Sequence, residues 1–257
     1  MLEPEHVRVN REAWTRNNAE YNDVTAAQAW ADPEVTWGLF AAPERDLRML
    51  PDVVGKEIIE LGCGTGYFGA RLKRLGARRV VGVDITPAQL DTARRLNREH
   101  GLGLEFIEAN AESVPLPDGV FDVAVSEYGA CLYCEPDLWI AEAARLLRPG
   151  GELIFLRNST LSLLCMPATG PVQDRLQRPQ LGLNRIVWDD DEPGIEFHPG
   201  TSDLLRCLQR SGFELVDFAE LFAHSGTRDH PRYSHIPADW AMRWPVEEIW
   251  RARKLPT

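Results

Sequence analysis

A glycine-rich turn and a downstream aspartate are the residues in this sequence whose types and spacing best fit a chemical role. The turn Glu60–Gly66 lies between an apolar β-rich run and a helical pattern, and Asp84 ends the next apolar run. Glycines let the backbone approach a ligand closely, and an acid at the tip of the second strand can accept hydrogen bonds from both hydroxyls of a ribose. The pattern therefore predicts a nucleoside site.

Two residues around this turn bear on which nucleoside it holds. A dinucleotide fingerprint that begins at Gly62 requires glycine at position 67, where the chain has Tyr67. Glu60 places a negative charge beside a helix amino terminus that a pyrophosphate would need to approach. That carboxylate is better matched to the cationic amino acid end of S-adenosylmethionine, reached directly or through water. S-adenosylmethionine is therefore the predicted cofactor, and a dinucleotide-dependent oxidoreductase is the disfavoured alternative.

The elements that must position these residues follow from alternating patterns. Between about residues 56 and 156, apolar β-rich runs alternate with helical patterns, which is typical of a parallel sheet with helices on both faces. The predicted fold class is α/β, with a doubly wound, mostly parallel seven-stranded sheet whose last strand is antiparallel. Strands are expected at residues 57–61, 79–84, 104–109, 121–126, from 152, 213–222 and 248–252, and helices at 67–75, from 86, 140–147 (ended by 149–151) and 201–210.

Several short motifs in the first half of the chain occur together in a fixed order. They are Glu60–Gly66, Gly82–Ile85, Asn110–Glu112 followed by Pro115–Gly119, Phe121–Asp122 and Leu147–Gly151. With these motifs, residues 57–156 closely resemble the class I methyltransferases, of the group that includes the ubiquinone and menaquinone C-methyltransferases. The carboxy-terminal half resembles them loosely. The resemblance implies an S-adenosylmethionine-dependent methyltransferase.

The resemblance also assigns the cofactor-binding residues. It implies that the glycine turn lines the methionine moiety, that Asp84 and Ile85 hold ribose and adenine, and that Ser126 lies beside the methyl donor. Asn110 stands where relatives usually carry aspartate, and its amide can still present an acceptor to the adenine amino group. The residues expected to bind the cofactor are Glu60, Gly62, Cys63, Gly64, Asp84, Ile85, Gln89, Asn110, Ala111, Glu112, Ser126 and Tyr21.

The amino-terminal segment Trp14–Trp30 is rich in aromatic and apolar residues. In relatives the corresponding helices lie over the cofactor as a lid, and Tyr21 is therefore expected among the cofactor-binding residues. The alternative is that Trp14 and Tyr21, seven residues apart, form the buried stripe of an amphipathic helix, which a lid helix also needs. The expected domains are a helical lid at 1–50, the cofactor core at 51–157, an acceptor cap inserted at 158–200, and the completion of the sheet at 201–257.

Methyl transfer from a sulfonium is a direct displacement, so the protein mainly supplies alignment and water exclusion. A hydroxyl or carbon-acid acceptor benefits from a general base, whereas a thiolate, halide or amine acceptor needs none. His198, at the end of the insertion, is the first candidate for that base, and Tyr128 is a second catalytic candidate; a structural role for any one histidine stays open. Other expected neighbours of the acceptor are Glu127, Tyr133, Trp139, Arg157 and Asn158, with His224, His230, His235, Trp188, Phe197, Trp240 and Trp244 as further candidates.

Net charge and cysteine content indicate which class of acceptor and which cell compartment to expect. The net charge of -11 repels a polyphosphate backbone, so nucleic acid is not an expected partner. No apolar segment is long enough for a signal peptide or a membrane span, and the 5 cysteines without a secretory signal indicate a cytoplasmic protein with reduced thiols. Cys131 and Cys134 lack a second ligand pair, so no metal is predicted. The expected function is methylation of a small molecule; the alternatives are a non-catalytic S-adenosylmethionine-binding protein and a protein or RNA methyltransferase.

Overall fold

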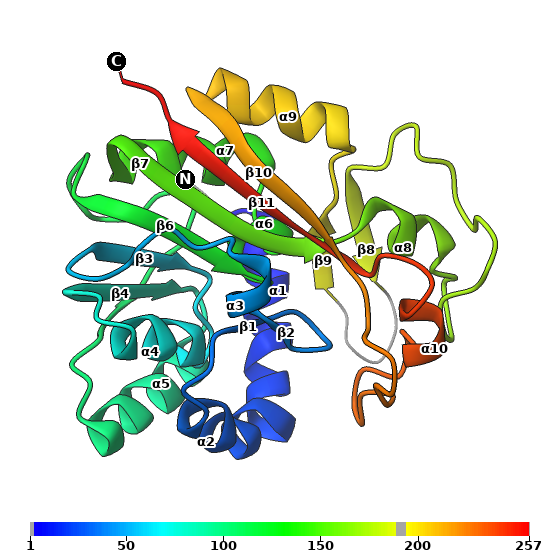
Figure 1. The fold of residues 1–257 in the computed structure, drawn as a ribbon, viewed down its shortest axis with the longest axis horizontal. Helices are drawn as coiled ribbons and strands as arrows, with labels where there is room; N and C mark the ends of the chain where they lie inside the picture. Colours follow the sequence, from blue (N-terminus) through cyan, green and yellow to red (C-terminus); the bar gives the residue numbers. More distant parts are fainter. Residues whose placement is uncertain (1–2, 189–193, 257) are drawn as a thin grey trace.

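A twisted seven-stranded sheet with helices on both faces organises the chain (Figure 1). The computed structural model describes residues 3–188 and 194–256. The strand order is β10-β11-β7-β6-β3-β4-β5, in which β11 runs antiparallel to both of its neighbours and the other strands are parallel to one another. The predicted fold, with an antiparallel last strand, is therefore confirmed. The strands are β3 (Glu57–Leu61), β4 (Arg79–Asp84), β5 (Glu105–Glu108), β6 (Phe121–Glu127), β7 (Leu147–Asn158), β10 (Phe213–Leu221) and β11 (Glu247–Lys254).

The helices between these strands begin where the sequence supplies local signals. A glycine with positive φ, Gly66, precedes α4, and Pro87 opens α5 with a φ that suits a first turn. Thr86 is the residue before α5, as expected for an N-cap, but its side chain makes no capping hydrogen bond. The helices are α4 (Tyr67–Arg74), α5 (Pro87–His100), α6 (Ala130–Tyr133), α7 (Pro136–Leu146) and α9 (Thr201–Arg210).

The helix expected at residues 140–147 differs from the observed one at both ends. It begins at Pro136, because a proline after the extended Glu135 is already set for a first helical turn, and it ends at Leu146. The segment 149–151 lies within β7 rather than in a turn that closes the helix. The register against β6 shifts between Phe121 and Val123, so the extra residues of this glycine-containing stretch form a bulge.

The amino-terminal 50 residues pack beside the cofactor core rather than apart from it. Figure 1 shows them in blue, next to α4 and α5, and the helix α2 contacts both of these helices. Trp30 and Trp37 are fully buried in the apolar cluster that also holds Phe68 of α4 and Ile58 of β3. The segment consists of α1 (Glu5–Asn17), a π-helical turn η1 (Asn18–Asn22), α2 (Asp23–Ala31), the hairpin β1 (Thr36–Trp37) and β2 (Ala42–Pro43), and α3 (Glu44–Leu47).

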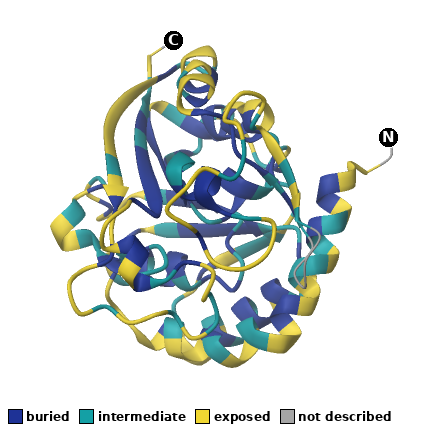
Figure 2. Cartoon of the chain, turned by 90° about the vertical axis from the view of Figure 1, so that its right-hand side faces the viewer, coloured by how far each residue is buried: buried dark blue, intermediate teal, exposed yellow. Residues whose placement is uncertain are grey.

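Described residues of the segment 158–188 and of the loop before β11 contribute to a smaller apolar cluster. Met166, Val172, Ile236, Trp240 and Val246 are buried there together. Figure 2 looks onto this side and shows exposed loops in front of a buried interior. The elements concerned are α8 (Thr160–Cys165), β8 (Arg185–Trp188), β9 (Gly194–Phe197) and α10 (Ala238–Ala241). Within residues 3–188 and 194–256, none of the helices has both the length and the apolarity that crossing a bilayer requires.

Candidate functional site

The glycine turn after β3 and the tip of β4 meet directly. The backbone N–H groups of Gly62 and Cys63 both donate to the carbonyl oxygen of Val83, at 2.8 and 3.0 Å. The N–H of Gly64 donates to Oδ2 of Asp84 at 2.8 Å, and Oδ1 of Asp84 accepts from the N–H of Thr86. The carboxylate that sequence reasoning expected at a ribose therefore also holds the turn in place.

Only glycine fits at two positions of this turn. Gly62 has a φ of 77°, and a Cβ there would lie 2.6 Å from backbone atoms of both Gly129 and Ala130. Gly64 has a φ of 51°, and a Cβ there would lie 2.5 Å from Oε1 of the buried Gln89. At these two glycines the turn thus approaches the residues after β6 and the start of α5 through its backbone alone.

Three carboxyl groups that can carry negative charge lie around this turn. Glu60 is buried, and its Oε2 accepts from the N–H of Gly69 at 2.9 Å. Burial raises the pKa of Glu60, and the charges of Glu127 and Asp84 raise it further. Burial likewise raises the pKa of Asp84 and of Glu127. A bound cation such as a sulfonium or ammonium would relieve this mutual repulsion, whereas a pyrophosphate would add to it.

The loop after β5 is joined to the same site by the N–H of Ala109, which donates to the carbonyl of Asp84 at 3.0 Å. Asn110 turns its amide onto its own loop: Oδ1 accepts from the N–H of Glu112 at 3.0 Å, and Nδ2 donates to Glu112 Oε2 at 3.1 Å. Burial opposes the ionisation of Glu112, but contacts with His6 and the N–H of Glu135 outweigh it and hold its pKa below the usual range. Ala111 between them is buried.

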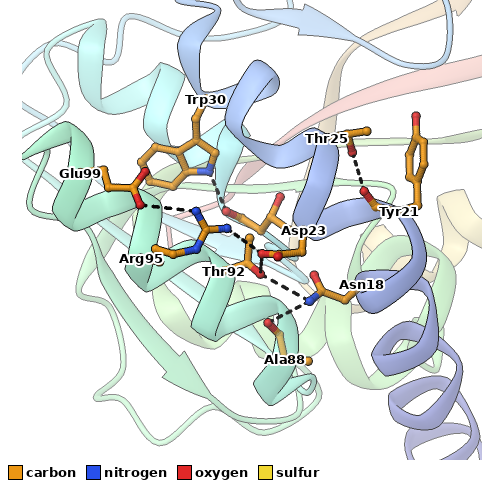
Figure 3. Close-up of polar contacts among 10 residues, drawn as sticks. Asn18, Tyr21, Asp23, Thr25, Trp30, Ala88, Thr92, Arg95 and Glu99 are labelled. Carbon is orange, nitrogen blue, oxygen red and sulfur yellow. Dashed lines mark hydrogen bonds and ion pairs between the residues drawn. The ribbon is translucent and has the colours of Figure 1, made fainter.

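Each of these loops is contacted by the amino-terminal helices. Arg11 Nε donates to the carbonyl of Ile85 at 3.0 Å, and His6 Nε2 lies 2.8 Å from Glu112 Oε1. Figure 3 shows the contacts of η1 and α2, among them Trp30 Nε1, which donates to the carbonyl of Thr65 at 2.8 Å, and Asn18 Nδ2, which donates to the carbonyl of Ala88 at 3.2 Å. These helices therefore lie over the glycine turn and the start of α5.

Tyr21 has different neighbours from the other expected cofactor residues. Its ring contacts Tyr233 edge-on at 6.2 Å, and the guanidinium of Arg232 lies 4.4 Å from its ring centroid. Trp14, the other aromatic residue of the predicted stripe, packs against Tyr133 at 5.3 Å. Tyr21 therefore connects η1 to the loop before β11, while the remaining expected cofactor residues gather at the tips of β3, β4, β5 and β6.

The end of β6 carries two expected site residues, and one of them contacts a residue of β11 that the sequence reasoning missed. Ser126 is fully buried, and its Oγ donates to the carbonyl of Leu61 at 2.8 Å, which ties β6 to the glycine turn. Tyr128 has a positive φ of 51°, and its hydroxyl donates to Oε1 of Glu247. Glu247, the first residue of β11, was outside the strand expected at 248–252, and no sequence motif marks it.

Glu127 and Glu247 both bind the turn of the β1–β2 hairpin. Glu127 accepts from the N–H of Gly38 at 3.3 Å and from the hydroxyl of Tyr67, and Glu247 accepts from the N–H of Leu39 at 2.6 Å. Burial raises the pKa of Glu247 to about 7 and that of the Tyr128 phenol well above its usual value. At neutral pH this group of side chains therefore holds exchangeable protons next to the glycine turn.

The raised pKa of Glu247 predicts a specific pH dependence of stability. The folded protein binds the proton of the Glu247 carboxyl group more tightly than the unfolded chain does. The protonated carboxyl group therefore stabilises the fold fully below about pH 4.5, and this contribution to the free energy of unfolding is lost as the pH rises to about 7. Relative to Glu247→Gln, the wild-type free energy of unfolding should fall by about 2 kcal/mol between pH ~5.5 and pH ~8. Urea unfolding of both proteins at both pH values measures this, and parallel behaviour of the two proteins would contradict it.

His198, the first candidate for a general base, is fully buried after β9. Its Nε2 lies 2.7 Å from Oε2 of Glu196, which also accepts from Nε1 of Trp188 at 2.8 Å. Its Nδ1 has no hydrogen-bond partner among the residues that the structure describes. Burial lowers the pKa of His198, and contact with Glu196 only partly offsets this, so the ring is neutral near pH 7. Nε2 of the expected base is thus within hydrogen-bonding distance of Glu196, whereas Nδ1 has no hydrogen-bond partner within the described residues.

Several of the other expected acceptor neighbours are structural. Trp139 was expected to line the acceptor pocket, and this prediction is wrong. Its ring packs edge-on against Phe155 in the core beneath α7, with 5.3 Å between the ring centroids. The helix begins earlier than expected, at Pro136, and so directs the side chain of Trp139 into the core. Trp240 lies in the small cluster of residues 165–246, and Trp244 is largely exposed. His230 accepts from the backbone of residues 232 and 233.

The pair Cys131 and Cys134 has protein contacts rather than metal-like geometry. Both thiols are free and buried. The thiol of Cys131 donates to the carbonyl of Leu156 at 2.9 Å, and that of Cys134 points toward Oδ1 of Asn110 at 3.9 Å. Across the described part of the chain, three or more metal-ligating side chains do not gather at any one place.

The helix α1 joins the loop of Glu112 to the strand that leads to His198. Asn10 is buried and accepts from the N–H of Ile195 at 2.8 Å while donating to the carbonyl of Ile195 at 2.9 Å. One helix turn earlier, the ring of His6 packs edge-on against Phe197 at 5.2 Å. The position of β9 therefore depends on the amino-terminal helix.

Replacing Asn10 tests this dependence. Asn10→Ala leaves both backbone groups of Ile195 without their partner, which should cost about 2–3 kcal/mol in urea unfolding. The matched control is Thr15→Ala on the same helix, where an exposed hydroxyl bonded to the Arg11 carbonyl is removed and the loss should stay within about 0.5 kcal/mol. Equal losses for both variants would contradict the role given to Asn10.

Comparison with known proteins gives the family of the domain that carries the glycine turn. A family model described as a methyltransferase domain matches residues 59–155. The ubiquinone/menaquinone biosynthesis C-methyltransferase UbiE of Shewanella frigidimarina is 29% identical over 176 residues, which are 65% of this chain and 70% of that relative. Residues 59–155 form a methyltransferase domain, and the chain is an S-adenosylmethionine-dependent methyltransferase.

Solved structures share the fold of this methyltransferase. An S-adenosylmethionine-dependent methyltransferase from Mesorhizobium loti matches with a TM-score of 0.66 at 24% identity, over 82% of this chain and 96% of that one. The 1,6-didemethyltoxoflavin-N1-methyltransferase of Burkholderia thailandensis, solved with S-adenosylhomocysteine, matches with a TM-score of 0.59 at 17% identity, over 100% of this chain and 92% of that one. The methyltransferase domain and these two neighbours together support S-adenosylmethionine as the cofactor of this chain.

The residues of the site fit this cofactor in charge and in shape. The positions of Gly62 and Gly64 exclude side chains, so the backbone itself can line a ligand. The carboxyl groups of Glu60, Asp84 and Glu127 provide the negative surround that a sulfonium and an ammonium group require. The same surround would oppose the pyrophosphate of a dinucleotide.

Proposed function

We propose that this methyltransferase transfers the methyl group to a small-molecule acceptor that is enclosed at the carboxyl ends of β6 and β7 and the amino end of β11. The observation that supports this most is the burial of the side chains that gather there. Ser126, His198 and Glu247 are each at most 2% exposed, beneath α1, the β1–β2 hairpin and β9. A site covered from three sides suits a small molecule better than a protein or RNA chain.

The relatives and the charge of the chain agree with this choice. The UbiE relative is named for ubiquinone and menaquinone biosynthesis, and the Burkholderia structure contains 1,6-didemethyltoxoflavin. The net charge of -11 disfavours a polyphosphate partner. The segment 158–200 would act as the acceptor cap and residues 1–50 as the lid over the cofactor.

The roles of the cofactor-binding residues follow from their places at the strand tips. Asp84 would hold the ribose hydroxyls with the oxygen lone pairs that Gly64 and Thr86 leave free, since a carboxylate accepts several hydrogen bonds. Residues 62–64 would line the methionine moiety, with Glu60 near its ammonium group. When bound, S-adenosylmethionine supplies a methyl group that its positively charged sulfur activates. The adenine and ribose would also be bordered by Ile85, Gln89, Asn110, Ala111, Glu112 and Ser126, with Tyr21 acting through the lid.

The protein's own contribution to the reaction would be alignment, water exclusion and proton transfer. With Nε2–H of His198 donating to Glu196, the neutral ring carries its free lone pair on Nδ1, which can take a proton from a hydroxyl or carbon-acid acceptor. Tyr128, bonded to Glu247, would form the opposite wall of the acceptor site. An acceptor that is already a nucleophile would use the same enclosure without the base.

The proposal is tested by incubating the protein with a metabolite extract and S-adenosylmethionine carrying a deuterated methyl group. Mass spectrometry should find the labelled methyl group in a metabolite, and at subsaturating cofactor the Asp84→Ala variant should form less of that product. Label found only in protein or RNA, or no labelled metabolite although S-adenosylhomocysteine binds, would overturn the proposal.

A further inference from the structure

A buried arginine at the end of β7 has hydrogen-bond donors that the protein does not use. The side chain of Arg157 is 1% exposed. Within the described residues, its Nε and Nη2 have no hydrogen-bond partner. The nearest carboxylate oxygen, Oε1 of Glu248, lies 3.5 Å from Nε, which is longer than the ~2.7–2.9 Å of a charge-assisted hydrogen bond. Buried guanidinium groups are normally satisfied, so this one requires an explanation.

The neighbouring strand β11 does not provide a hydrogen-bond partner that satisfies the guanidinium of Arg157. Glu248 pairs with Arg157 in the register of β11 against β7, so the two side chains lie on the same face of the sheet. Burial raises the pKa of Glu248 and lowers that of Arg157, which shows that their mutual attraction does not compensate for the loss of water around either group. The guanidinium is therefore held in place without being neutralised.

The other polar groups around Arg157 do not neutralise it either. Its positive charge reaches His198, whose pKa it lowers, and the thiol of Cys131. Glu196, the carboxylate nearest to His198, is already bonded to that histidine and to Trp188. Arg178 adds a second positive charge within reach of His198. This side of the sheet thus carries unused positive charge next to the unpartnered Nδ1 of His198.

The opposite face of the same strand ends has the reverse charge. Glu127 lies two residues after Val125, and Glu247 lies two residues before Ile249. Val125 and Ile249 both pack in the apolar cluster beneath α4. Phe155, two residues before Arg157, packs in the cluster beneath α7. Alternate residues of a strand point to opposite faces. The acids that suit a sulfonium and the arginine that suits an anion therefore flank the site from opposite sides.

We propose that Arg157 binds an anionic oxygen group of the methyl acceptor, and hence that the acceptor is an organic acid charged at neutral pH, as a carboxylate or an acidic enol is. The inference rests on the proposed small-molecule function and names its substrate class. The guanidinium would donate Nε–H and Nη2–H to the acceptor oxygen atoms, which places the acceptor beside His198 and orients it away from the carboxylates. Arg157 is thus an acceptor-binding residue, and it takes no part in binding the cofactor.

The first arm of the test separates the substrate class from the function itself. A metabolite extract is divided on an anion-exchange resin at pH ~8, and each fraction is incubated with the protein and methyl-labelled S-adenosylmethionine. Labelled product should arise from the retained, anionic fraction. Product from the unretained fraction alone would overturn the inference and leave the proposed function standing, whereas the absence of any labelled metabolite would remove both.

The second arm uses variants with the active fraction as the probe. Arg157→Met keeps most of the side-chain volume, and the buried Glu248, whose pKa burial already raises, can take up a proton once the arginine is removed, so this variant should fold. It should raise the KM for the active fraction at least about tenfold and change kcat and the Kd for S-adenosylhomocysteine by less than about threefold. Arg157→Lys should recover part of the loss. Glu248→Gln is the matched control: an unchanged or lower KM is expected, whereas a KM rise equal to that of Arg157→Met would show that the ion pair alone matters.

Discussion

Replacing Asp84 with alanine should weaken the binding of S-adenosylhomocysteine by about 1–3 kcal/mol, which is roughly 5- to 150-fold in Kd. The carboxylate lies at the tip of β4, where it accepts from the N–H groups of Gly64 and Thr86, and the proposed function gives its remaining lone pairs to the ribose hydroxyls. Removal takes away the ribose ligand and loosens the turn, and both effects reduce affinity. Calorimetric titration of the folded variant measures the change.

Two variants separate these effects. Asp84→Asn keeps an acceptor for the N–H of Gly64 but loses the charge, so its affinity should lie between those of the wild type and Asp84→Ala. Asp91→Ala removes an exposed carboxylate on α5 whose only ion pair in the described chain is with Arg94, and its affinity should be unchanged. An Asp84→Ala protein that binds as the wild type does would show that this carboxylate is not the ribose ligand.

Replacing Gly62 with alanine should destabilise the protein far more than the same change at another glycine of similar φ. At Gly62 the new Cβ meets the backbone of Gly129 and Ala130 at 2.6 Å, and neither can move without displacing the end of β6. Gly103 has a φ of 71° and no atom within 4 Å of a Cβ, so Gly103→Ala pays only for its backbone conformation, about 1 kcal/mol. Gly62→Ala should lose at least about 2 kcal/mol more.

Urea unfolding of the two alanine variants gives this difference directly. The Gly62→Ala protein should also lose most of its affinity for S-adenosylhomocysteine, because the turn and Ser126 are tied together through Leu61. Comparable stability of the two variants would mean that the turn and the end of β6 are not packed as described, and would remove the basis for placing the methyl donor between them.

The part of the site that lies on adjacent parallel strands could be predicted from the sequence. Asp84 and the glycine turn come from consecutive strand–helix units, and the carboxyl ends of such strands meet at one edge of the sheet. Local patterns of apolar residues, glycine and proline were sufficient to find these units. For the same reason the helix at 201–210 and the strand that follows it were found within a residue of their observed ends.

The residues that sequence reasoning missed depend on contacts between distant segments. Glu247 meets Tyr128 only because β11 inserts beside β7, and Leu39 reaches it only because a hairpin folds over that edge. Trp139 was misplaced because its helix begins at Pro136, and the added turn directs the indole ring into the core. Arg157 was expected beside the acceptor, but nothing in the local sequence distinguishes it from an exposed arginine at the end of a strand, and its burial becomes evident only once β11 pairs with β7.

A crystal structure of the protein with S-adenosylhomocysteine tests the central claim most directly. We expect the ribose hydroxyls within hydrogen-bonding distance of the Asp84 carboxylate, the adenine beside Ala111 and Glu112, and the sulfur above the turn of residues 62–64, on the side of Ser126. An adenosyl group bound at any other place on the molecule would contradict it.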